Sequence, residues 1–233
     1  MLLVVEGTIG AGKSTFVKLI SERIGAVPLY EPHTLWQKSV GGFSLLELFY
    51  KDPYRWAYTF QNYAYQSKII AWEEVMQKYS STQIFLAERS IFSDYYCFAR
   101  SAYQKKFMSE LEWDLYTTEF SWWASRTIKP AGFIYLSLSV ERAYERVVSR
   151  GRREELGVGR EYLTQLHTAH EQLLREQACP LMPEAPLLIL DVERDFEFDP
   201  MAQMAHAQKV AQTFNTPMFF DIPSREHPTL TML

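Results

Sequence analysis

The sequence predicts an α/β fold in which helices flank a parallel sheet of five strands. Apolar, β-branched runs alternate along the chain with longer segments of helical periodicity, as in a sheet covered on both faces. The first run leads into a glycine-rich turn and then into an amphipathic helix. No glycine-, proline- or serine-rich linker separates two domains, so we expect one domain at 1–215 and a tail at 216–233.

The predicted elements follow in chain order. Runs of apolar, β-branched and aromatic residues predict strands at 2–5, 26–30, 84–87, 132–138 and 187–190. Apolar positions three or four residues apart predict helices at 13–24, 54–79, 92–103, 110–127, 140–150, 161–176 and 201–214. The tail contains three prolines, and we expect it to lie over the surface or to be disordered.

The composition excludes several classes of protein. The 233 residues include 24 Lys and Arg against 28 Asp and Glu, and a net charge of -4 offers no field for binding a nucleic acid. Only two cysteines, Cys97 and Cys179, argue against a disulfide framework and fit a reducing compartment. The chain has neither a signal-like start nor an apolar run long enough to span a bilayer. We therefore expect a soluble, cytoplasmic protein whose partners are neither nucleic acids nor membranes.

A phosphate-binding loop is the clearest local feature. The segment Gly7-Thr8-Ile9-Gly10-Ala11-Gly12-Lys13-Ser14-Thr15 matches G-x-x-x-x-G-K-[ST] between a predicted strand and a predicted helix. Glycines allow backbone N–H groups to face phosphates, Lys13 reaches the β and γ oxygens, and Ser14 can coordinate Mg²⁺. The alternative is a glycine-rich turn without a ligand. The sequence thus predicts a P-loop that binds a nucleoside triphosphate.

Acidic residues follow predicted strands at the sheet edge where ligands bind. Glu31-Pro32 comes after the second strand, and a carboxylate there can accept a proton from an attacking hydroxyl; a solvated loop end is the alternative. Glu88-Arg89-Ser90 comes after the third strand, where P-loop proteins often place an acidic magnesium partner. Asp191, after the fifth strand, fits that role as well, and the pattern alone leaves both open.

Arginines recur along and beyond the helix predicted at 140–150, at Arg142, Arg146, Arg150, Arg152 and Arg153. In an acidic protein such a cluster favours a lid that closes on polyphosphate, because guanidinium groups neutralise the charge that develops during phosphate transfer. The alternative is a solvated helix face whose arginines pair with the neighbouring glutamates at 141 and 145.

Taken in this order, the segments resemble the deoxyribonucleoside kinase family, which includes deoxycytidine, deoxyguanosine and deoxyadenosine kinases. The resemblance runs from Leu3 to about Thr213 and also rests on Trp36 and on the segments 45–50, 55–56, 59–61, 93–94 and 191–196. It implies a P-loop kinase fold with an arginine-rich lid. It also implies a homodimeric enzyme that moves the γ-phosphate of ATP, with Mg²⁺, to the 5′-hydroxyl of a deoxyribonucleoside.

The resemblance also implies a role for each matching residue. Glu31 is the implied base for the 5′-hydroxyl, and Arg89 holds that end of the substrate. Lys13 binds the transferred phosphate, while Glu88 and Ser14 serve Mg²⁺. Tyr50 and Glu155 are the implied pair for the 3′-hydroxyl. Arg150 and Arg152 are the implied contacts of the phosphates. The donor's adenine is bordered by the segment that contains Asp191, Asp195 and Phe196. The adenine role weighs against Asp191 as the magnesium partner.

The residues implied for the base slot narrow the substrate. Gln61 has a donor and an acceptor for a base edge, and the implied walls are Trp36, Leu46, Phe60 and Phe98. Lys68 and Asp94 stand where purine- and cytidine-accepting members carry an Arg–Asp pair. Asp94 can accept a hydrogen bond from the exocyclic amine of adenine or cytosine, which thymine lacks, so thymidine should be a poor substrate. Lys68 departs from the family pattern because lysine lacks the planar guanidinium of arginine. The choice among adenine, guanine and cytosine stays open, with purines favoured.

Two other classes of function remain open. A nucleoside monophosphate kinase of the thymidylate kinase type also has a P-loop and an arginine-rich lid, but His33-Thr34-Leu35-Trp36 lacks a glycine-rich turn for the acceptor's phosphate. A non-catalytic subunit with this fold should have lost parts of the site, whereas the residues implied for chemistry and phosphate binding are all present.

Overall fold

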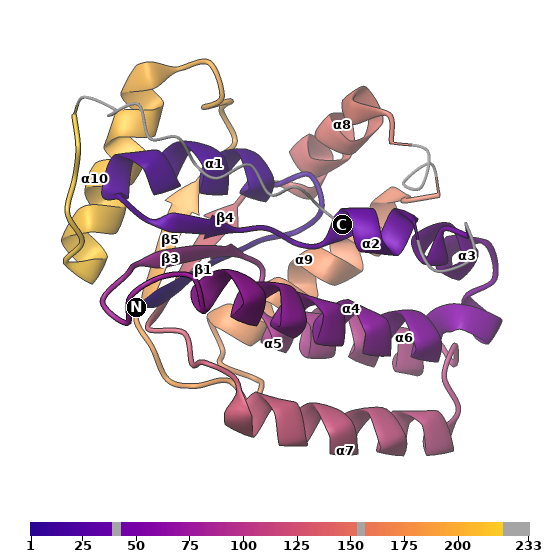
Figure 1. Cartoon of the computed structure of the whole chain (residues 1–233). Helices are drawn as coiled ribbons and strands as arrows, with labels where there is room; N and C mark the ends of the chain where they lie inside the picture. The colour runs from indigo at the N-terminus through magenta and orange to yellow at the C-terminus, as the bar shows by residue number, and fades with distance from the viewer. Residues whose placement is uncertain (39–42, 153–156, 221–233) are drawn as a thin grey trace.

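The sheet in the computed structural model is parallel and has five strands in the described residues, as predicted (Figure 1). The structure describes residues 1–38, 43–152 and 157–220. In spatial order the strands are β2 (Val27–Leu29), β3 (Phe85–Glu88), β1 (Leu2–Glu6), β4 (Gly132–Ser137) and β5 (Leu187–Asp191). Because β1 lies in the middle, its carboxyl end places the P-loop at the centre of the sheet edge where ligands bind in such folds.

The two faces of the sheet form separate parts of the core. Every residue of β1 is buried; Leu3 and Val5 belong to the hydrophobic cluster on one face, and Leu2 and Val4 to that on the other. This alternation follows from the two-residue period of a strand, and a strand buried on both faces therefore reads as a continuous apolar run.

Six long helices begin and end within three residues of their predicted bounds. They are α1 (Lys13–Ile24), α4 (Pro53–Met76), α7 (Glu110–Arg126), α8 (Val140–Arg150), α9 (Arg160–Leu174) and α10 (Pro200–Phe214). Apolar side chains of α1, α8 and α10 pack in one cluster, while α4 and α9 contribute to the cluster on the opposite face. None of the helices in the described residues is long and apolar enough to cross a membrane.

Two short helices, α2 (His33–Gln37) and α3 (Leu45–Lys51), are not among the predicted elements. Ser44 caps α3 by accepting a hydrogen bond from the N–H of Glu47, and the Asp52 side chain caps α4 in the same way. Asp52 is the only residue between the two helices, and α3 packs along α4 and closes one side of the site described below.

The prediction of one continuous helix at 92–103 is wrong. The chain forms α5 (Ile91–Ser93), a π-helix (Asp94–Ala99) and α6 (Arg100–Gln104) in succession. A π-helix has more residues per turn than an α-helix and occurs frequently at functional sites. Here the wide turn carries Asp94 and Phe98, both of which line the cavity described below.

The first part of the predicted tail is packed on the domain. Phe219 donates its backbone N–H to the carbonyl oxygen of Arg23 at 2.7 Å, and its ring lies beside Gly25 at the end of α1. Residues 221–233 lie outside the described residues. Cys97 and Cys179 are free and buried.

Acid should destabilise the protein partly through His170, which is fully buried on α9. Its Nδ1 lies 2.7 Å from the carbonyl oxygen of Leu166, and its ring packs edge-on against Phe98. Burial and the nearby Arg89 lower the pKa of His170 to about 3. The unfolded chain therefore binds a proton between about pH 6.5 and pH 3 that the native protein does not, so stability falls as the pH falls through this window.

His170→Asn keeps a side-chain donor for the Leu166 carbonyl but removes this titration. In urea unfolding at pH 6 to 4, the wild type should lose up to about 1.4 kcal/mol more per pH unit than the variant. Equal slopes for the two proteins would show that His170 does not contribute to acid sensitivity.

Candidate active site

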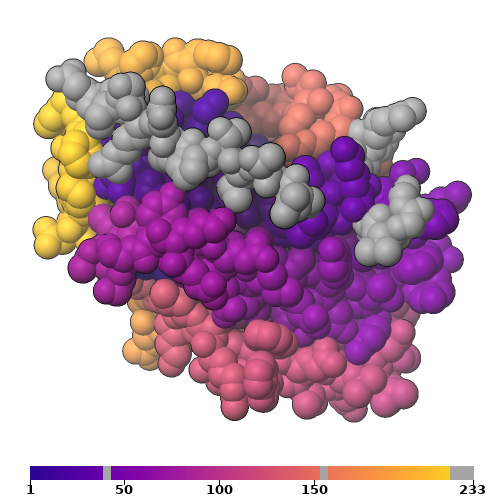
Figure 2. All heavy atoms as spheres, in the orientation of Figure 1, coloured from indigo at the N-terminus to yellow at the C-terminus, as the bar shows by residue number. Residues whose placement is uncertain are grey.

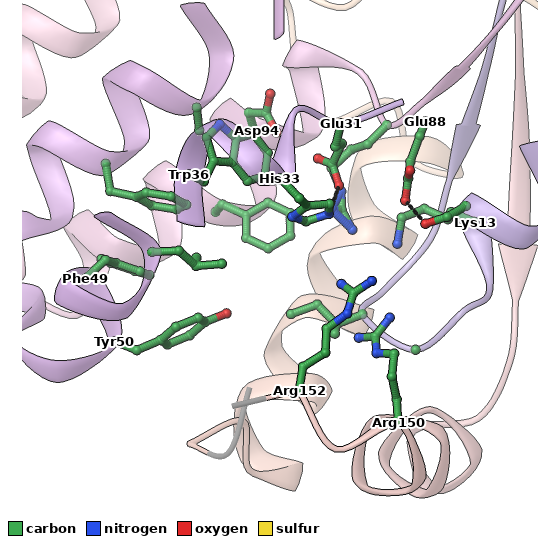
Figure 3. A pocket seen from close by; sticks show the side chains of 18 of the residues that line it. Lys13, Glu31, His33, Trp36, Phe49, Tyr50, Glu88, Asp94, Arg150 and Arg152 are labelled. Carbon is green, nitrogen blue, oxygen red and sulfur yellow. Dashed lines mark hydrogen bonds and ion pairs between the residues drawn. The ribbon is translucent and has the colours of Figure 1, made fainter. Parts of the chain in front are cut away.

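A cavity of about 220 Å³ opens at the carboxyl ends of the central strands (Figure 3). It is bounded by the P-loop, by the ends of β2 and β3, by α2 to α4, by the π-helix, and by residues from α8 and α9. Most of the predicted site residues lie around it: Ile9, Gly10, Gly12, Lys13, Ser14, Thr15, Glu31, Trp36, Leu46, Tyr50, Phe60, Gln61, Glu88, Arg89, Asp94, Phe98, Arg150 and Arg152. The structure thus brings together residues separated by more than 100 positions.

The P-loop joins β1 to α1 in a conformation that needs glycine. Gly10 and Gly12 have φ values of 86° and 84°, a region that residues with a Cβ rarely adopt. The ammonium of Lys13 donates to the carbonyl oxygen of Thr8 at 2.9 Å, within its own loop. Burial and the proximity of Arg89 lower the pKa of Lys13 to about 7. An anionic polyphosphate in this loop would stabilise the charged form of Lys13.

A hydroxyl and a carboxylate meet beside the P-loop. Ser14, at the start of α1, donates its Oγ–H to Oε1 of Glu88 at 2.7 Å, the dashed line in Figure 3. Asp191 lies at the end of the edge strand β5, does not line the cavity, and accepts a hydrogen bond from the N–H of Glu193. The geometry therefore favours Glu88 over Asp191 as the acidic partner of Ser14.

Glu31 lies among cationic groups just after β2. Its Oε1 is 3.1 Å from Nζ of Lys68, and its Oε2 is 3.5 Å from both Nη1 of Arg89 and Nε2 of His33. Burial alone would raise the pKa of Glu31, but Arg89 and Lys68 outweigh that effect and hold it well below the usual value. The carboxylate is therefore ionised, and it faces the same cavity as the P-loop.

The backbone of Arg89 is strained, with a φ of 58° that is rare outside glycine. Buried Glu6 holds the next residue in place, because its Oε1 accepts from both the N–H and the hydroxyl of Ser90, at 2.8 and 2.5 Å. The guanidinium of Arg89 donates to the Gly7 carbonyl at 3.2 Å and lies over the ring of Phe98. This turn directs Arg89 toward both Glu31 and the P-loop.

Aromatic side chains line the far side of the cavity. The ring of Phe60 stacks on Phe49 and meets the edge of Trp36, with centroids 5.0 and 5.8 Å apart. Gln61 is almost fully buried beside them and lines the cavity. Lys68 lies behind this wall with no exposed surface. These walls are typical of a slot for a flat ring.

Asp94 and Lys68 are in contact. The ammonium lies 2.8 Å from each of the two oxygens of the carboxylate. Burial raises the pKa of Asp94, and the charge of Lys68 opposes that shift. Burial lowers the pKa of Lys68, but Asp94 and Glu31 reverse the effect and raise it.

The arginine cluster divides into two groups. Arg150 and Arg152 line the cavity and point toward Lys13 in Figure 3. Arg142 and Arg146 instead bind Asp195, with N–O distances of 2.9 and 2.8 Å, so they hold the loop after β5. The predicted lid residues Arg153 and Glu155 lie outside the described residues.

The segment predicted to border the donor's adenine lies apart from the cavity. Asp191, Asp195 and Phe196 do not line it. Phe196 is buried against α1, where its ring lies 5.9 Å from that of Phe16 and comes close to Gly12. The segment therefore lies behind the P-loop.

Known proteins resemble this chain over nearly its whole length. A family model described as deoxynucleoside kinase matches residues 3–215. The chain belongs to the deoxynucleoside kinase family. Deoxycytidine kinase 1 of Xenopus laevis is 35% identical over 91% of this chain and 89% of the relative. Deoxycytidine kinase of Mus musculus is 36% identical (83% and 84% covered), and the mitochondrial deoxyguanosine kinase of Xenopus laevis is 35% identical (84% and 82% covered).

Membership in this family confirms the predicted fold and enzyme class: the chain is an ATP-dependent kinase of deoxynucleosides. A deoxynucleoside kinase must bring a neutral nucleoside hydroxyl next to the terminal phosphate of ATP. The cavity provides an aromatic slot at one end and the P-loop at the other, with Glu31 and Arg89 between them.

Four residues around the kinase cavity are absent from the predicted site: His33, Phe49, Ala64 and Tyr162. His33 is two positions from Glu31, and Phe49 lies between the predicted Leu46 and Tyr50, so proximity in sequence signals both. Ala64 lies on α4 one turn after Phe60. Tyr162 lies on α9, and no nearby motif points to it.

Proposed function

We propose that this kinase phosphorylates deoxycytidine or a purine deoxynucleoside at the 5′-hydroxyl and discriminates against thymidine. Asp94 carries the proposal. Its carboxylate lines the base slot, and although Lys68 lies 2.8 Å from both of its oxygens, a carboxylate oxygen can accept a further hydrogen bond, here from the exocyclic amine of a base. The named relatives are deoxycytidine and deoxyguanosine kinases, whose substrates carry such an amine.

In the proposed reaction, the 5′-oxygen attacks the γ-phosphorus, the bond to the β,γ-bridging oxygen breaks, and ADP leaves. Glu31 takes the proton of the hydroxyl, for which its ionised carboxylate is suited. Lys13 and Arg89 offset the negative charge on the transferred group. Ser14 and Glu88 supply oxygen ligands of the kind Mg²⁺ prefers, and the ion would neutralise charge on the phosphates.

Arg150 and Arg152 are proposed to contact the phosphates from the lid side. Their guanidinium groups reach the cavity opposite Glu31, and Arg–phosphate pairs are strong, often bidentate contacts. Tyr50 and Glu155 remain the proposed pair for the 3′-hydroxyl, and Asp191, Asp195 and Phe196 the proposed border of the donor's adenine. Crosslinking with an azido-adenine analogue of ATP tests the latter, and labelling away from 191–196 would contradict it.

A homodimer is proposed on the exposed apolar side chains of α4 and α7. These two helices lie side by side, and Figure 2 shows the purple atoms of α4 directly above the pink atoms of α7. Large apolar side chains remain exposed on them: Tyr63, Ile70, Leu111, Leu115 and Trp122. Sedimentation should give twice the chain mass of 27.3 kDa, and a monomer at micromolar concentration would contradict the proposal.

A cytoplasmic location stays a prediction, which cell fractionation tests.

The substrate proposal is tested with ATP and a panel of nucleosides. Thymidine should have a kcat/KM about tenfold to a hundredfold below the best of deoxycytidine, deoxyadenosine and deoxyguanosine, because a carboxylate facing the carbonyl of thymine costs about 1 to 3 kcal/mol. The double variant Lys68→Met with Asp94→Ala should raise the ratio of thymidine to deoxycytidine efficiency by a similar factor.

Each single variant should raise that ratio less than the double variant, because it leaves one buried charge without its partner. A wild type that prefers thymidine, or an unchanged ratio in the double variant, would contradict the role of Asp94 and Lys68. Phosphorylation of deoxynucleoside monophosphates alone would contradict the whole proposal.

A further inference from the structure

The ammonium of Lys68 is shared between two carboxylates that belong to different parts of the site. It lies 2.8 Å from the oxygens of Asp94, in the base slot, and 3.1 Å from Oε1 of Glu31, beside the P-loop. Lys68 itself is fully buried and does not line the cavity. A residue whose only task was to assist base recognition would need contact with Asp94 alone.

Lys68 is also the nearest cation to Glu31 among the described residues. Arg89 and His33 contact the other carboxylate oxygen, Oε2, at 3.5 Å. The two oxygens of Glu31 are thus contacted by different elements, Oε1 by Lys68 of α4 and Oε2 by Arg89 after β3 and His33 in α2. Removing Lys68 would leave Oε1 without its ion pair and let the carboxylate turn toward Arg89.

The chemistry of lysine suits this shared position. An ammonium is a compact charge with three donors on a flexible stem, so it can serve oxygens in different directions, whereas a guanidinium is a flat fork matched to one carboxylate. Burial makes the ion pairs consequential, because a carboxylate left unpaired in such surroundings is strongly disfavoured. Glu31 and Asp94 are both at least nine-tenths buried.

We infer that Lys68 is a positioning residue for Glu31 as well as the partner of Asp94, so that one ammonium orients both the carboxylate that reads the base and the carboxylate that takes the hydroxyl proton. This inference rests on the proposed role of Glu31. It follows that Lys68 contributes to the phosphoryl-transfer rate with every nucleoside, including thymidine, which offers Asp94 no amine.

A double-mutant cycle between Lys68→Met and Glu31→Gln tests the inference. The rate of a single turnover is measured at saturating ATP and saturating thymidine, and again with deoxycytidine. Lys68→Met should lower the rate about tenfold or more with both nucleosides when Glu31 is present. In the Glu31→Gln background, where no carboxylate remains to be positioned, the same substitution should change the rate less than twofold.

Two results would overturn the inference. One is an equal loss in both backgrounds, which would make the effect of Lys68 independent of Glu31. The other is a loss with deoxycytidine but not with thymidine, which would assign Lys68 to base recognition alone. A Glu31→Gln enzyme with the wild-type rate would instead contradict the proposed base, and the inference with it, so the two failures are distinguishable.

Controls separate positioning from folding. Lys78→Met removes an exposed lysine just beyond α4 and should leave the rate within twofold of the wild type. Lys68→Arg restores the charge with a flat fork in place of the ammonium, so it should recover only part of the rate lost in Lys68→Met, whereas equal rates in these two variants would also overturn the inference. If Lys68→Met lowers the thermal midpoint below the assay temperature, Lys68→Gln takes its place in the cycle.

Discussion

Replacing Glu31 with glutamine should lower kcat by about 10² to 10⁴, the usual contribution of a general base. Glutamine has nearly the same shape but cannot take the proton of the 5′-hydroxyl. Because Arg89 and Lys68 hold the pKa of Glu31 well below its usual value, the carboxylate should stay ionised down to acidic pH. Its own titration should therefore cause no loss of activity between pH 8 and pH 6.

The measurement is steady-state kinetics with ATP and the best nucleoside, together with nucleoside binding by calorimetry. Binding should change little, because the substitution removes a proton acceptor rather than a wall of the slot. Glu73→Gln alters an exposed glutamate of α4 and serves as the matched control. A kcat for Glu31→Gln within a few-fold of the wild type would exclude Glu31 as the base.

Arg152→Ala should lower kcat by about 10² to 10³ while changing the nucleoside KM less than threefold. The guanidinium lies at the cavity and is proposed to act on charge that is greatest during transfer, so its loss affects the transition state more than nucleoside binding. Arg152→Lys retains the charge without the fork and should recover only part of the loss.

For this arginine the matched control is Arg126→Ala, which removes an exposed guanidinium at the end of α7. The same kinetic measurements apply to all three variants. An unchanged kcat in Arg152→Ala would show that Arg152 does not act in phosphate transfer and is a solvated surface residue.

The centre of the fold follows closely from the sequence because its constraints are local. The P-loop needs glycines at fixed positions between a strand and a helix, so β1 and α1 are determined within a single segment. The apolar runs of β3 and β4 are equally plain, since a strand covered on both faces has few polar positions. The cluster of Glu31, Glu88 and Arg89 then follows from the common edge at which parallel strands end.

The sequence does not predict features that depend on contacts between distant segments, or on one extra residue in a helical turn. The π-helix at Asp94–Ala99 differs from an α-helix by about one residue in a turn, which apolar periodicity over ten residues does not resolve. The contact between Lys68 and Glu31 links α4 to the end of β2, and nothing in either segment encodes it. The family resemblance pairs Lys68 with Asp94 and makes Glu31 the base, but it implies no contact between Lys68 and Glu31.

The packing of the P-loop glycine Gly10 limits how the proposed lid arginines can move. A Cβ at this position would lie 2.5 Å from the carbonyl oxygen of Ala143, so the loop rests directly on the first turns of α8. Arg142 and Arg146 join those turns to Asp195. Because these contacts hold the first turns of α8, we expect any movement of Arg150 on substrate binding to come from the last turn of the helix. Movement of Arg152 can come from Gly151, which has a left-handed φ of 62°.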